Sequence, residues 1–100
     1  MRKGTTPSFV FELPFGIDQI QNAKVTFSTG GKTKLEKYLS DCSMSGKEIT
    51  VKLSQEETFL FECNTPVKVQ LRVVTVSGDA LSSDVFDIFA FQCLDDEVIT

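Results

Sequence analysis

Histidine and tryptophan are both missing from this chain of 100 residues. Without an imidazole there is no Ser-His or Cys-His pair and no general base of that kind. Carboxylates are dense only at Glu56-Glu57 and at Asp95-Asp96-Glu97, where neighbours in sequence splay apart on a strand and make poor paired acids. These absences predict a protein that is not an enzyme and that uses no cofactor.

Cysteine is scarce, and its number is odd: Cys42, Cys63 and Cys93. An odd count without tight spacing does not indicate a disulfide framework. With no histidine, a zinc site would need cysteines and carboxylates alone, which is rare. We therefore predict three reduced thiols that bind no metal, in a protein that folds in the cytoplasm.

Long apolar runs are also absent. No stretch approaches the length of a transmembrane helix, and the basic start is followed by Pro7, Glu12 and Pro14, which interrupt any signal-peptide core. The net charge is −4 and the pI about 4.7, and an acidic chain is poorly suited to binding phosphate backbones. The expected partners therefore include neither a membrane nor a nucleic acid.

Aromatic residues are present almost entirely as phenylalanine, with nine Phe and one Tyr. Phe has no polar group, so most of these rings are expected in a core. A chain of this length forms one domain, which we take to span residues 1–100.

The clearest pattern in the chain lies at Val67–Val76. Val67, Val69, Leu71 and Val73 alternate with polar residues, which is typical of a half-buried strand. A turn at residues 77–80 follows, so we predict a hairpin in which this strand pairs with the one that begins at residue 84. In this register Val69 and Leu71 are fully buried.

Similar alternation predicts four further strands and one short pairing segment, over residues 8–13, 22–28, 33–39, 48–53 and 41–44. The pair Gly30-Gly31 suits a hairpin turn between the second and third of them. Lys37 falls on the apolar side of its strand, and together with Lys34 it indicates an edge strand protected against pairing.

Ser54 followed three residues later by Glu57 is a capping box. It predicts a short helical turn near residues 55–60, with Phe59 or Leu60 packed beneath it. About seven short strands separated by regular turns favour an all-β antiparallel sandwich.

The last run, residues 84–94, fits two interpretations. Either both faces of this strand are covered, or a bulge reverses the direction of its side chains midway. Phe89 and Phe91 lie on one face, where they are either core residues or a partner-binding patch beside the acidic Asp95-Asp96-Glu97 end. We name Phe89 and Phe91 as the candidate partner-binding residues.

Several phrases resemble the amino-terminal domain of phage upper baseplate proteins and related small prophage tail proteins of Gram-positive hosts. They are Arg2–Thr5, Asn22–Phe27, Ile49–Thr58, Val69–Val73 and Ser77–Asp79. The Ile49–Thr58 phrase is similar to the family's strand followed by a Leu-Thr-x-Glu-Asp-Thr turn, whereas Gly78-Asp79 inverts the family's commoner Asp-Gly order.

The resemblance implies an immunoglobulin-like sandwich and a structural role in a phage or prophage tail or baseplate. The partners would then be other tail or baseplate proteins, or further copies of the chain, and the location would be the virion, after synthesis in the bacterial host cytoplasm. The alternative is an immunoglobulin-like adhesion or ligand-binding domain of a bacterial surface protein.

Overall fold

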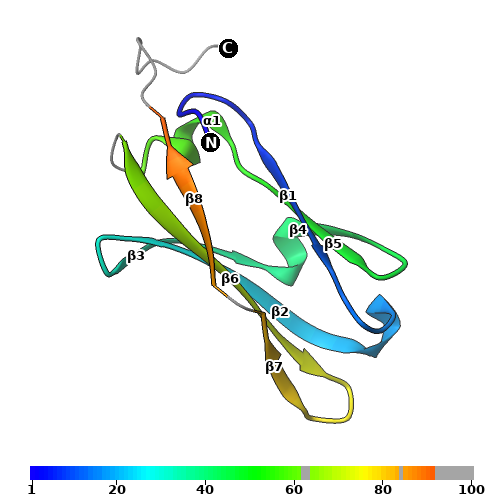
Figure 1. The fold of residues 1–100 in the computed structure, drawn as a ribbon. Coiled ribbons are helices and arrows are strands. Elements are labelled where there is room, and N and C mark those ends of the chain that lie inside the picture. Colours follow the sequence, from blue (N-terminus) through cyan, green and yellow to red (C-terminus); the bar gives the residue numbers. More distant parts are fainter. Residues whose placement is uncertain (62–63, 84, 92–100) are drawn as a thin grey trace.

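Two antiparallel sheets pack face to face in this protein (Figure 1). The computed structural model describes residues 1–61, 64–83 and 85–91. The smaller sheet has the order β1-β5-β4, formed by Ser8–Glu12, Glu48–Lys52 and Cys42–Ser45. The larger sheet has the order β3-β2-β6, formed by Lys32–Tyr38, Ile20–Thr29 and Thr65–Thr75, with β7 (Ala80–Ser82) and β8 (Phe86–Ala90) both paired to β6.

This strand order is that of an immunoglobulin-like sandwich. When β1 is taken as strand B, the two sheets correspond to B-E-D and to C′-C-F-G. The predicted antiparallel sandwich is confirmed. The structure describes eight strands rather than about seven, because the last predicted run begins after a separate short strand, β7.

Strand β6 forms the centre of the larger sheet, with β2 on one side and β7 and β8 on the other. Val67, Val69, Leu71 and Val73 are all at most 5% exposed, which confirms the predicted register. The predicted hairpin is also confirmed, since Val69 pairs with Phe86 and Thr65 with Ala90. Because β6 bonds on both sides, its backbone is satisfied along the sheet.

A register shift separates the two strands that pair with this side of β6. Arg72 lies opposite Ser82, whereas Val69 lies opposite Phe86. The two β6 positions are three residues apart in sequence, but their partners are four residues apart. The extra residue is the mark of a bulge. It reverses the side-chain direction before β8 begins. Within β8 the register with β6 is continuous and the face that carries Asp87 and Phe89 is exposed. For the described residues, therefore, neither interpretation of the last run holds: one face is uncovered, and no bulge lies midway along the strand.

The hairpin of β2 and β3 follows the sequence prediction. Gly30 and Gly31 both take positive φ, at 60° and 76°, a conformation that glycine adopts without strain. Strand β3 is an edge strand, as predicted. Lys34 is exposed, whereas Lys37 is half-buried and forms an ion pair with Glu57. An inward-pointing charge of this kind is one of the ways in which proteins protect an edge strand.

The predicted helical turn is confirmed as α1 (Gln55–Thr58), and a second turn, the 3-10 helix η1, spans Ile17–Gln19. The capping box is formed: the Glu57 N–H donates to Ser54 Oγ at 3.1 Å, and the Ser54 N–H donates to the Glu57 carboxylate at 2.8 Å. The aromatic ring buried near α1 is that of Phe61, at 1% exposed, rather than Phe59 or Leu60. Another 3-10 helix, η2 (Leu39–Asp41), precedes β4.

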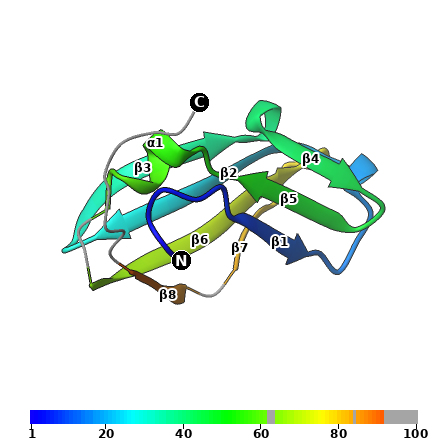
Figure 2. The same cartoon turned by 90° about the horizontal axis from the view of Figure 1, so that it is seen from above.

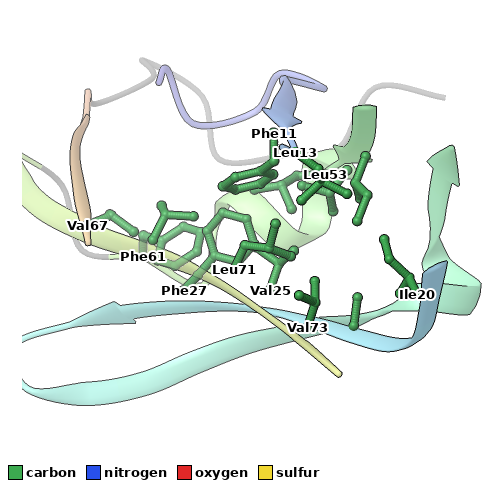
Figure 3. Close-up of a cluster of buried hydrophobic side chains, with 14 of the residues drawn as sticks. Phe11, Leu13, Ile20, Val25, Phe27, Leu53, Phe61, Val67, Leu71 and Val73 are labelled. Carbon is green, nitrogen blue, oxygen red and sulfur yellow. The ribbon is translucent and has the colours of Figure 1, made fainter. Parts of the chain in front are cut away.

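The core fills the space between the sheets (Figure 3). Phe27 of β2 is fully buried, and its ring lies 5.7 Å from that of Phe9 on β1 and 6.1 Å from that of Phe61. These three rings join the two sheets.

Leu71→Ala should lower the free energy of unfolding by about 2–5 kcal/mol, because it removes a buried side chain opposite Val25 and leaves a cavity. Val74→Ala on the same strand is the control, since Val74 is 38% exposed. Denaturant unfolding measures both. Equal losses in the two variants would contradict the register of β6.

Candidate interaction surface

The candidate residues Phe89 and Phe91 lie on the outer face of β8, at its end. They are 40% and 45% exposed, and their ring centroids are 5.0 Å apart. Ala90 between them is fully buried, as alternation on a strand requires. The interpretation of these two rings as core residues is therefore wrong.

Arg2 completes the surface, and we call Arg2, Phe89 and Phe91 the aromatic patch. The Arg2 guanidinium lies 5.6 Å from the centre of the Phe91 ring, a distance at which a cation is attracted to a ring face. No local pattern could have indicated Arg2, because it comes from the opposite end of the sequence.

The N-terminal segment lies beside β8 in both views (Figures 1 and 2). Backbone hydrogen bonds fix it there. The Phe91 N–H donates to the Met1 carbonyl at 2.7 Å, and the Lys3 N–H donates to the Phe91 carbonyl at 3.0 Å. The pairing at Arg2 and Phe91 is parallel. The patch is thus built on ordered backbone, which reduces the entropy lost when a partner binds.

The same segment is also held to α1. The Gly4 N–H donates to Thr58 Oγ1 at 2.8 Å, and Thr58 is fully buried. The ammonium group of Lys3 lies 5.9 Å from the centre of the Phe59 ring. The position of Arg2 therefore depends on α1 as well as on β8.

Lys37 and the capping box hold α1 in turn. Burial alone would raise the pKa of Glu57, but hydrogen bonds from Lys37 and from the Ser54 N–H outweigh it and hold that pKa below its usual value of 4.5. The charged form of Glu57 is thus the form that the folded protein favours.

Next to the patch, the outer face of the larger sheet carries charged side chains, and farther along it Tyr38 and Val74 are exposed. Lys68 pairs with Asp87 at 3.0 Å, and Lys24 pairs with Glu36 at 3.3 Å. A shallow hollow lies among these side chains near Arg72, which forms no ion pair within the described part of the chain. The two exposed rings therefore stand out against a charged surround.

Metal and thiol chemistry is limited in the part of the chain that the structure describes. Over residues 1–61, 64–83 and 85–91, no three His, Cys, Asp or Glu side chains gather as a metal site would need. Cys42 is a free, half-buried thiol. Cys63, Cys93 and the acidic Asp95-Asp96-Glu97 end lie outside the described residues.

Within the described ranges no helix is long and apolar enough to cross a membrane.

Comparison with known proteins gives no family assignment. No family model matches the chain, and no curated protein does. Among solved structures, the V domain of amphioxus IgVJ-C2 is similar at 10% identity and a TM-score of 0.36, over 90% of this chain and 96% of that one. A likeness this distant supports no conclusion, so the description of the fold rests on the strand order given above.

Glu57→Gln should lower the free energy of unfolding at neutral pH. It should also make that free energy decrease less as the pH falls into the acid range. Because the folded pKa of Glu57 lies below its unfolded value, its contribution is complete above about pH 4.5 and is lost as the pH falls through the folded value. Denaturant unfolding across this range measures the effect. Exposed Glu56 in the same turn provides the control, Glu56→Gln, and identical pH profiles for the two variants would contradict the role given to Glu57.

Proposed function

We propose that this chain is a non-catalytic docking module of a phage or prophage tail or baseplate, and that it binds another tail protein through the aromatic patch. The observation that carries the proposal is the pair of adjacent exposed rings, Phe89 and Phe91, with Arg2 beside them. The protein would be made in the bacterial host cytoplasm and become part of the virion.

The composition of the patch supports a role in binding a protein. Aromatic residues and arginine are enriched at the centres of protein interfaces and supply most of their binding energy. A Phe side chain is stiff, so little entropy is lost when it is covered. Lys68 and Asp87 lie on the same face of β6 and β8 and would form part of a polar rim.

The sequence resemblance supports the tail context. Of the phrases that carry it, Ile49–Thr58 falls on β5 and α1, and Val69–Val73 falls on the centre of β6. Arg2–Thr5 includes the segment that holds the aromatic patch in place. The resemblance thus extends from the core to Arg2 of the proposed docking surface, but it does not include Phe89 or Phe91.

The test combines Phe89→Ser with Phe91→Ser. Because both rings are exposed, the double variant should keep its fold, as circular dichroism would show, and should bind the tail protein at least about tenfold more weakly. The genes on either side of this one identify the tail proteins to purify. Particles isolated from the producing bacterium should contain the unaltered chain but little of the double variant.

The matched control combines Leu60→Ser with Val76→Ser, two side chains that are 48% and 66% exposed at other places on the surface. This control should bind and assemble normally. Recovery of the chain in the cell-surface fraction, with none in particles, would contradict the proposal and favour the adhesion-domain alternative. Equal binding by both double variants would leave the tail role standing but remove the patch from it.

A further inference from the structure

Strand β1 presents unused backbone groups along its outer edge. The Leu13 N–H donates to the Lys47 carbonyl at 2.7 Å, and the Leu53 N–H donates to the Pro7 carbonyl at 2.9 Å. The odd-numbered residues from Pro7 to Leu13 therefore form the backbone hydrogen bonds to β5. The even-numbered residues Ser8, Val10 and Glu12 point their N–H and C=O groups away from it. No strand in the described part of the chain pairs with that edge (Figure 2).

The other sheet edges are shorter or already protected. Strand β3 carries exposed Lys32 and Lys34, the end of β8 is bonded to the segment around Arg2, and β4 and β7 have four and three residues. Proteins commonly block exposed edges with lysine, proline or a covering segment. Between its ends, β1 has none of these: its central residue is Val10, which is 57% exposed.

On the outer face beside this edge, the acidic and basic side chains lie at opposite ends of the strand. Glu12 lies directly opposite Glu48 on β5, so two like charges face each other at one end. Lys52 lies opposite Ser8 at the other end. None of the three charged groups forms an ion pair with the described residues. One end of the edge is acidic and the other is basic.

We propose that two copies of this chain associate by antiparallel pairing of their β1 edges, centred on Val10. In this register Val10 meets Val10 of the second copy, and Ser8 meets Glu12 in both directions. The outward groups of both strands then form about six backbone hydrogen bonds, and the two three-stranded sheets become one continuous sheet.

Charge complementarity identifies a second copy as the occupant of the edge. Reversing one strand against the other brings the acidic end, Glu12 and Glu48, towards Lys52 of the second copy. The intervening Ser8 is small, so the long Lys52 side chain can extend across it. An interface of this kind is self-complementary, as a two-fold dimer requires.

Apolar surface next to the edge also favours association. An open groove of about 380 Å³ separates β1 from β7 and β8, and its lining includes Phe11, Leu81 and Phe86. Leu81 and Phe86 are 46% and 48% exposed. A second copy at the β1 edge would narrow the mouth of this groove and cover part of that surface.

This pairing uses a different surface from the aromatic patch and does not rest on the proposed tail function. Strand-edge contacts alone bury a small area, so the dimer is expected to be weak and to depend on protein concentration. Since its ion pairs are exposed, salt should weaken it further.

Val10→Pro and Val10→Lys test the pairing by sedimentation equilibrium. The proline removes an N–H that makes no bond to β5, and the lysine places like charges at the two-fold centre. Both variants should stay monomeric at concentrations where the unaltered chain dimerises, with unchanged circular dichroism. Val76→Lys, at another exposed valine, and Phe89→Ser with Phe91→Ser should still dimerise.

A charge exchange tests the register. Glu12→Lys and Lys52→Glu should each weaken the dimer several-fold, and the double variant should restore it, because the exchange re-forms opposite charges across the interface. A merely structural role for either residue would not produce this recovery.

Cross-linking gives a test that does not depend on tolerance of a disruptive change. Directly opposed, hydrogen-bonded residues have Cα atoms about 5.5 Å apart, within disulfide range. Val10→Cys should therefore form a disulfide between the substituted positions of two copies on mild oxidation, identified by peptide mass spectrometry. Val76→Cys should not.

Three results would each overturn the proposal. The unaltered chain could stay monomeric at its highest soluble concentration, or a dimer could persist unchanged in both Val10→Lys and the single charge variants. A dimer abolished by the Phe89→Ser and Phe91→Ser pair, without cross-linking at Val10→Cys, would place the contact at the aromatic patch instead.

Discussion

The packing of Phe27 between the two sheets is the contact on which the rest of the structure depends. Its ring touches Phe9 from the smaller sheet and Phe61 from the segment after α1, and it is shielded completely from solvent. In a domain of this size, a few fully buried rings supply a large share of the apolar area removed from water. Once these rings pack, the sheets have a fixed separation and β1 has a fixed orientation.

That orientation determines which surfaces remain for binding. Because Phe9 and Phe11 point to the core, Val10 must point outwards and the backbone of β1 must face away from β5 at alternate residues. At the far end of β8, the same alternation buries Ala90 and exposes Phe89 and Phe91. Both candidate surfaces thus follow from the packing of the core.

Much of the fold could be predicted from the sequence, because the alternation of apolar and polar residues within a short segment indicates a strand. Leu71 and its neighbours in β6 are buried as the period of two requires, and the Ser54–Glu57 capping box marks α1. Pairs that are distant in sequence carry no such signal. The contact of Arg2 with Phe91 and the ion pair of Lys37 with Glu57 depend on the assembled sandwich, so neither was predicted.

The candidate site was predicted in part. Phe89 and Phe91 could be named, but their exposure depends on the register shift between β7 and β8, and a one-residue shift leaves no mark in composition. The free edge of β1 was also missed, since a local pattern shows that a strand exists but not which strands lie beside it. The lysines of β3 indicated that strand as an edge instead, and one of them, Lys37, points towards α1.

Residue-resolved amide hydrogen exchange, measured from dilute to concentrated protein, tests most directly the claim that β1 has a free edge used for pairing. The account predicts rapid exchange at the Val10 amide in dilute solution and slower exchange as concentration rises, while the Phe9 and Phe11 amides, bonded to β5, are protected throughout. A Val10 amide that is protected in dilute monomer, or one that exchanges rapidly at every concentration, would contradict it.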